Sequence, residues 1–182
     1  MIAGWGGTHP LAVATYAACS TALYAASAAY HLVDFGDAVT ARLRRLDHAA
    51  IFLMIAGTAT PVLAHALSGT SRTLMLAAVW GVAIAGMLFR TLWLGAPRWL
   101  YTAAYVGAGW VVLLRWKAVV SGIPPFALAF VIAGGVVYTL GALVYALKWP
   151  DPLPERFGFH EIWHLFVLAA STLHFVAVAR LI

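Results

Sequence analysis

Long apolar runs separated by short polar breaks make up most of this sequence. A helix of about 20 apolar residues crosses a membrane core about 30 Å thick, and six of the runs approach or exceed that length. The predicted spans are Leu11–Val33, Leu46–Leu67, Leu74–Leu94, Trp99–Val120, Pro124–Leu147 and Phe159–Ile182. Gly, Pro, Ser, Asp and Arg in the breaks are typical of turns. The pattern therefore predicts an all-α fold, a polytopic transmembrane helical bundle of six spans.

The composition supports a membrane protein and argues against a soluble or nucleic-acid-binding one. Hydrophobic residues make up 64% of the chain and charged residues 9%, whereas an ordinary soluble domain is about 25% charged. The net charge is +5, but the cations stand singly or in small groups between apolar runs, as topology signals do. We expect one transmembrane domain over residues 1–182, with membrane lipids as partners and no nucleic acid. The sequence does not indicate an oligomeric state.

The distribution of cations between alternate breaks predicts the orientation of the chain. Seven of the eleven Lys and Arg fall on one side of the membrane and four on the other. The larger set is Arg42, Arg44, Arg45, Arg90, Arg98, Lys148 and Arg156, and the smaller is Arg72, Arg115, Lys117 and Arg180. Because cytoplasmic segments carry the excess of Lys and Arg, we expect the larger set to face the cytoplasm. Both termini would then face outward, away from the cytoplasm.

Polar residues gather at three span ends that share one side of the membrane. Successive spans run in opposite directions, so the end of the first, the start of the second and the start of the sixth lie at the cytoplasmic face. The residues at these ends are Ser27, His31, Asp47, His48, His160, Glu161 and His164. Ionisable residues within spans are costly and by default indicate a functional site. The pattern predicts one site near the cytoplasmic face.

Three of these residues have the chemistry of a zinc site. His160 and His164 are four residues apart, so they share a helix face with Cβ atoms about 5–6 Å apart. A catalytic zinc ion has about three protein ligands and an open position for water, and His31 is the candidate for the third. We therefore predict Zn²⁺ held by His31, His160 and His164. Asp47 would lie against a water molecule at the metal and accept its proton.

Several neighbouring residues have alternative interpretations. Asp47 could instead cap the start of its helix. His48 is turned about a third of a turn from Asp47, so we assign it to supporting the site or to helix packing. Ser171 and His174 follow His164 on the same face, with His174 about 15 Å deeper. They either line a polar cavity leading from the metal or form a structural bond between helices.

A short motif offers a different reaction for the same two histidines. The sequence His160-Glu161-Ile162-Trp163-His164 matches H-E-x-x-H, in which two histidines bind zinc and the glutamate is the general base of a metalloprotease. In a membrane helix this match indicates an intramembrane zinc metalloprotease. The two hypotheses differ in the carboxylate that accepts the proton. It is Asp47 in the three-histidine zinc site and Glu161 in the metalloprotease.

Dispersed motifs in the chain resemble a known family. Ser27-x-x-x-His31, Arg45-Leu46-Asp47-His48 and His160-x-x-x-His164 resemble the hemolysin III branch of the progestin and adipoQ receptor family. The resemblance implies a seven-helix membrane fold and a zinc site near the cytoplasmic face. By this resemblance the three histidines are the ligands, and Asp47, with Ser27 nearby, holds the water at the metal.

The resemblance also implies a class of activity. Animal relatives are associated with hydrolysis of the ceramide amide bond, so a metal-dependent, ceramidase-like hydrolase acting on a lipid amide is the expected function. The bacterial branch is named for cell lysis. The alternative is therefore a non-enzymatic receptor-like or pore-forming membrane protein in which zinc is structural.

The chain departs from the family pattern at its beginning. The first family helix has no counterpart before Gly4-Trp5-Gly6-Gly7, so the six spans are expected to correspond to family helices two to seven. The family has an inward amino terminus, and removal of one helix leaves an outward one. The charge count and the resemblance therefore agree on the orientation, with the carboxyl terminus outside.

Overall fold

The fold is a bundle of membrane-length helices. The computed structural model describes residues 9–32 and 36–181. Within these ranges six helices are long and apolar enough to cross a membrane, and there is no β-strand, so the predicted six-span all-α bundle is confirmed. Parts of the expected pattern lie outside the described residues, namely Gly4-Trp5-Gly6-Gly7, the first span's end at Val33, the turn residues Asp34 and Phe35, and Ile182.

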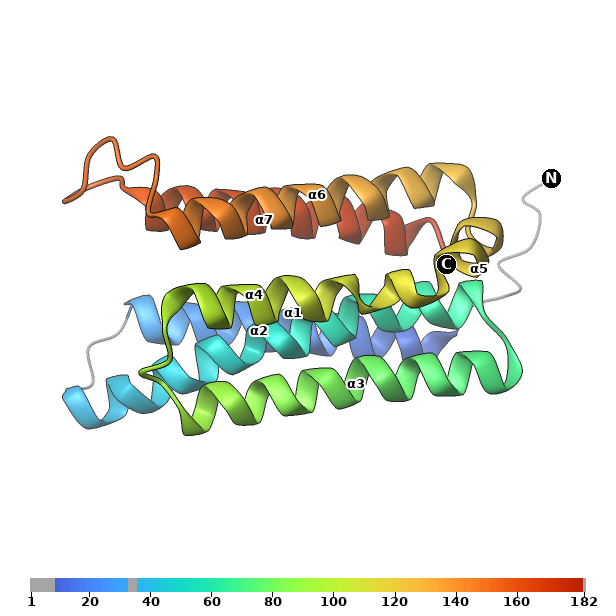
Figure 1. Cartoon of the computed structure of the whole chain (residues 1–182), viewed down its shortest axis with the longest axis horizontal. Coiled ribbons are helices and arrows are strands. Elements are labelled where there is room, and N and C mark those ends of the chain that lie inside the picture. Colours follow the sequence, from blue (N-terminus) through green and yellow to red (C-terminus); the bar gives the residue numbers. More distant parts are fainter. Residues whose placement is uncertain (1–8, 33–35, 182) are drawn as a thin grey trace.

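The helices run roughly antiparallel along the long axis of the molecule (Figure 1). They are α1 (Pro10–Leu32), α2 (Asp37–Ala66), α3 (Gly69–Leu92), α4 (Arg98–Trp110), η1 (Val111–Arg115), α5 (Trp116–Gly122), α6 (Pro125–Leu147) and α7 (Phe159–Ala179). The closest pairs are α1 with α2, α2 with α3, and α6 with α7. The end of α1 and the starts of α2 and α7 lie at the same end of the bundle (Figure 1), as the alternation of spans predicts.

Small residues allow the paired helices to approach closely. A Cβ atom at Gly57 of α2 would overlap Cys19 of α1, and one at Gly86 of α3 would overlap the ring of Phe52 of α2. Membrane helices associate through such close packing, because lipid tails are as apolar as the side chains and give no hydrophobic driving force. The Gly57 contact holds α1 close to α2 and so sets the position of the residues near the end of α1, and the Gly86 contact holds α3 close to α2.

The second helix is longer than the apolar run that predicted it. It begins at Asp37 rather than Leu46. The added segment contains no Gly or Pro and is rich in Ala, Leu and Arg, which are good helix formers, and Asp37 lies in the first turn, where a negative charge is favourable. Asp47 is therefore in the helix interior, and the interpretation of Asp47 as a capping residue is wrong.

The fourth span is one membrane crossing but not one α-helix. We expected a continuous helix over Trp99–Val120, whereas α4 gives way to the 3-10 turn η1 before α5. Gly107 and Gly109 precede this turn and Val111 lies in it. Glycine and β-branched residues are weak helix formers, which accounts for the change in helix type. The whole segment, Arg98–Gly122, still has the length and hydropathy of a span.

Candidate metal centre

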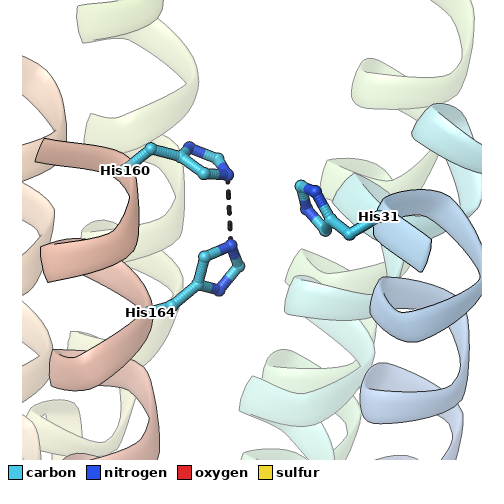
Figure 2. Close-up of side chains that lie close together, drawn as sticks. All are labelled: His31, His160 and His164. Atoms are coloured by element: carbon cyan, nitrogen blue, oxygen red, sulfur yellow. Dashed lines mark hydrogen bonds between the residues drawn. The ribbon is translucent and has the colours of Figure 1, made fainter. Parts of the chain in front are cut away.

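The structure brings together three histidines from two helices. His31 lies in the last turn of α1, and His160 and His164 lie in the first two turns of α7. Figure 2 shows the three rings facing one another. One candidate ligand atom from each residue lies within 4.8 Å of the others. The His31 ring centroid is 5.3 Å from that of His160 and 5.2 Å from that of His164.

This donor set fits a zinc ion. The two Nε2 atoms of His160 and His164 are 3.1 Å apart, a separation that one ion can bridge because a zinc–nitrogen bond is about 2.0–2.1 Å long. Imidazole nitrogen is a ligand type well suited to zinc. Three protein ligands are also the number that leaves a position open in catalytic zinc sites. The side chains present are thus chemically suitable for the expected metal.

Asp47 and Ser27 lie beside the histidine group. The Asp47 side chain is buried, with 9% of its surface exposed. Its polar neighbours are the hydroxyl of Ser27 and the imidazole of His31. Asp47 does not belong to the three-histidine group itself. Asp47 and Ser27 therefore line the same cavity as the three histidines, with the carboxylate outside the candidate ligand group.

The site borders a large cavity inside the bundle. The cavity has a volume of about 860 Å³, which is near the upper end of the range for small-molecule sites. Ser27, His31, Asp47, His160 and His164 all line it, and most of the remaining lining is apolar, including Leu23, Ile51, Val131, Ile132, Val136 and Val167. A long apolar group therefore has room beside the histidines.

Glu161, the carboxylate of the protease-like motif, has a different environment. Its side chain is exposed and does not line the cavity. Its Oε2 atom accepts a hydrogen bond from the backbone N–H of Gly158, at 2.8 Å. Glu161 thus caps the start of α7. This position does not suit a general base acting between His160 and His164.

Arg90 and His48 form a contact that the sequence did not predict. Arg90 is 1% exposed, and its guanidinium donates hydrogen bonds to the carbonyls of Trp93 and Leu94, at 3.2 and 3.3 Å. It is also hydrogen-bonded to Nδ1 of His48 and lies 4.2 Å from the centroid of the Tyr101 ring. The distribution of cations along the sequence identifies Arg90 only as a topology charge. Arg90 does lie inside the apolar run Leu74–Leu94, and an ionisable residue within a span indicates a buried residue with a partner.

The deeper residues Ser171 and His174 join helices, and His174 also lines the cavity. The Ser171 hydroxyl is 2.5 Å from that of Tyr24, which links α7 to α1. Nε2 of His174 lies 3.1 Å from the carbonyl oxygen of Val131 on α6, and His174 lines the cavity. The interhelix interpretation is supported for both residues, and the cavity interpretation for His174.

Comparison with known proteins agrees with the fold and the arrangement of motifs. The family model described as "Haemolysin-III related" matches residues 2–175. Hemolysin-3 of Bacillus cereus is 35% identical over 133 residues, which cover 73% of this chain and 58% of the relative. The hemolysin-3 homolog of Bacillus subtilis (strain 168) is 32% identical over 136 residues, which cover 75% of this chain and 61% of the relative.

A more distant similarity extends to an animal receptor. The adiponectin receptor protein of Drosophila melanogaster is 35% identical over 60 residues, which cover 30% of this chain and 14% of that protein. This similarity supports the link to the progestin and adipoQ receptor superfamily. The chain spans less than two thirds of the length of the bacterial relatives. The family match over residues 2–175 shows that this membrane protein belongs to the haemolysin-III related family.

Proposed function

We propose that this protein is a zinc-dependent hydrolase of lipid amide bonds, with a ceramidase-like reaction. The observation that carries the proposal is the convergence of His31, His160 and His164 on the border of a cavity of about 860 Å³. The cavity walls are mainly apolar, so they suit the acyl chain of a lipid whose polar group lies at the histidines.

Each residue of the site has a role that follows from its position. His31, His160 and His164 would hold the zinc ion, which when bound polarises a carbonyl oxygen and lowers the pKa of water. Asp47, buried beside His31, accepts the proton of the attacking water. The hydroxyl of Ser27 orients the Asp47 carboxylate. The apolar cavity holds the acyl chain and keeps bulk water from it.

We place the site at the cytoplasmic face of a bacterial inner membrane. The three arginines in the first turns of α2 and the connection between α6 and α7 lie at the same end of the bundle as the histidines (Figure 1). This end carries the excess of positive charge in the sequence, and such an excess faces the cytoplasm. The end of α7 at Ala179 would then lie outside.

The proposal is tested by metal content and turnover in the same preparations. Purified wild-type protein should contain stoichiometric zinc, and His164→Ala should lose it. Asp47→Asn should keep the zinc but lower turnover of a ceramide-like amide by about 10²–10⁴-fold, the usual contribution of a general base. Zinc content is measured by elemental analysis, and the fatty acid product by mass spectrometry.

Two results would contradict the proposal. Unchanged zinc in His164→Ala would remove the metal site, and full turnover in Asp47→Asn would remove the role of the carboxylate. Both variants should be checked for unchanged helix content, so that loss of the fold is not mistaken for loss of chemistry.

A second candidate is a receptor-like or pore-forming protein with structural zinc. The observation in its favour is that the candidate ligands come from α1 and α7, which pack mainly on other helices. A metal bound there would tie two parts of the bundle together. In this case Asp47→Asn would lyse lipid vesicles as well as wild type does, and neither protein would release a hydrolysis product.

A further inference from the structure

The deeper part of the cavity region contains a second group of polar side chains, remote from the candidate metal centre. Tyr24 of α1, Tyr138 of α6, and Ser171 and His174 of α7 meet there. Along α7, His174 is ten residues beyond His164, which corresponds to about 15 Å. Polar groups at this depth are costly unless they form hydrogen bonds, so each donor and acceptor in this group needs a partner.

The hydrogen bonds of His174 define which ring nitrogen carries a proton. Nε2 lies 3.1 Å from the carbonyl oxygen of Val131. Because a carbonyl only accepts, Nε2 is the donor, and Nδ1 of the neutral ring carries a lone pair. The Nδ1 atom is buried and has no hydrogen-bond partner in the described part of the chain. His174 therefore presents an unused acceptor.

Tyr138, whose ring lies beside that of His174, presents a second buried polar atom without a partner in the described part of the chain. Its ring centroid is 5.5 Å from that of His174, and its buried hydroxyl makes no hydrogen bond within residues 9–32 and 36–181. Ser171 is its polar neighbour. The Ser171 hydroxyl donates its proton to the carbonyl of Leu168, at 3.0 Å, and lies 2.5 Å from the hydroxyl of Tyr24, so it has no proton to offer Tyr138.

We propose that Tyr138 and His174 form an internal site for a hydroxyl group. A hydroxyl can donate to Nδ1 of His174 and at the same time accept from the O–H of Tyr138. A carbonyl oxygen could serve only Tyr138, and an ammonium group has no acceptor for the Tyr138 proton. Both side chains line the cavity, so the hydroxyl comes either from a hydroxylated lipid chain or from water.

This site goes beyond the proposed function because it does not require zinc or hydrolysis. Its chemistry depends only on two unpartnered polar atoms, Nδ1 of His174 and the hydroxyl of Tyr138, on side chains that border the cavity. If the ligand is a lipid chain, the site selects chains that carry a hydroxyl remote from the polar head. If the ligand is water, the site holds that water in the interior of the bundle.

Two adjacent glycines of α6 provide a matched pair of variants. A Cβ atom at Gly134 would overlap the imidazole of His174, whereas one at Gly135 would meet nothing within 4 Å. Gly134→Ala should therefore displace the ring and disrupt the site. Gly135→Ala makes the same chemical change on the next residue and should leave the site intact.

The lipid arm of the test compares two probes that differ only in one hydroxyl. The affinities of stearate and of a hydroxystearate with its hydroxyl at mid-chain are measured with the purified protein in detergent. If the site takes a lipid hydroxyl, wild type should bind the hydroxylated chain about tenfold more tightly, as expected for one or two net hydrogen bonds. Tyr138→Phe and Gly134→Ala should reduce this preference to none, and Gly135→Ala should keep it.

His164→Ala separates this proposal from the zinc proposal. Any contact of the carboxylate head with a metal is common to both probes, so the preference should survive in His164→Ala even where overall affinity falls. A preference that survives in Tyr138→Phe would show that the hydroxyl is recognised elsewhere and would overturn the site.

The water arm applies if wild type binds both probes equally. The Nδ1 resonance of His174 is then measured in nitrogen-15 spectra of histidine-labelled protein. It is assigned by its loss in His174→Gln, and its position shows whether Nδ1 accepts a hydrogen bond. A hydrogen-bonded Nδ1 whose resonance moves in Tyr138→Phe supports water as the occupant. Equal binding of the probes together with an Nδ1 resonance that is unchanged in Tyr138→Phe overturns the proposal.

Discussion

Asp47 and Glu161 are acidic residues near the same histidines, but their environments are opposite. Asp47 is buried beside Ser27 and His31 and lines the cavity. Glu161 is exposed and its carboxylate is bonded to the backbone at the start of α7. A proton acceptor must reach the reacting water, so of these two carboxylates Asp47 is the one that suits the base of the proposed hydrolysis.

Replacement of Glu161 tests this distinction. Glu161→Gln keeps an oxygen that can accept the Gly158 N–H and removes only the charge, so zinc content and turnover should stay at the wild-type level. The measurement is zinc content and product formation, side by side with Asp47→Asn, which makes the same acid-to-amide change. Abolished turnover with zinc retained in Glu161→Gln would instead support the protease hypothesis.

Individual site residues were predictable to different degrees. The pairing of His160 with His164 follows from helix geometry, and the addition of His31 follows from the alternation of spans. The bond between Arg90 and His48 was not predictable, because it depends on the rotation of α2 and α3 about their own axes. Hydropathy gives the presence of a span but not which of its side chains meet those of another helix.

At the level of elements, the contact between α1 and α2 determines where His31 and Ser27 lie. Gly57 packs against Cβ and Sγ of Cys19. The position of Cβ is fixed by the backbone, so a larger residue at position 57 cannot be accommodated by a change of rotamer. The two helices would have to move apart, which would also displace the end of α1.

Gly57→Ala should therefore destabilise the bundle. Overpacking typically costs about 1–3 kcal/mol, seen as a lower thermal midpoint in detergent. Gly81→Ala on α3 is the control, because a Cβ atom there meets nothing within 4 Å. Adding Cys19→Gly to Gly57→Ala removes the opposing Cβ and should restore much of the stability. If the thermal midpoint of Gly57→Ala equalled that of Gly81→Ala, the close packing of Gly57 against Cys19 would be contradicted.

The ends of elements were less predictable than their existence. All six spans follow from the apolar runs, but the charged start of α2 was assigned to a turn because hydropathy cannot distinguish an exposed helical turn from a loop. The position of Asp47 in the helix interior was missed for this reason. The 3-10 turn η1 was missed because the fourth apolar run is continuous across it.

At the scale of the whole molecule, the candidate metal centre lies between two helix pairs. α1 packs chiefly on α2, and α7 packs chiefly on α6. The hydrogen bond between Tyr24 and Ser171 is one direct link between α1 and α7. Zinc held by His31 together with His160 and His164 would add another link, seven residues further along α1 than Tyr24.

Removal of zinc should therefore lower the stability of the whole bundle. A ligand at a hundredfold excess over its Kd stabilises by about 2.7 kcal/mol, which corresponds to about 5–10 °C in a chain of this size. A chelator should lower the thermal midpoint of wild type by this amount and leave that of His31→Ala unchanged. An equal shift in both proteins would contradict a metal link between α1 and α7.

The contact between Arg90 and His48 has a consequence for proton transfer. A guanidinium group has donors and no acceptor, so Nδ1 of His48 must be the acceptor of their hydrogen bond. The neutral ring then carries its proton on Nε2. His48 lines the cavity with neither nitrogen free to take up a proton, and it can offer only an N–H to a bound molecule. Of this pair only Asp47, its neighbour in the chain, has the chemistry of the proton acceptor that the proposed hydrolysis requires.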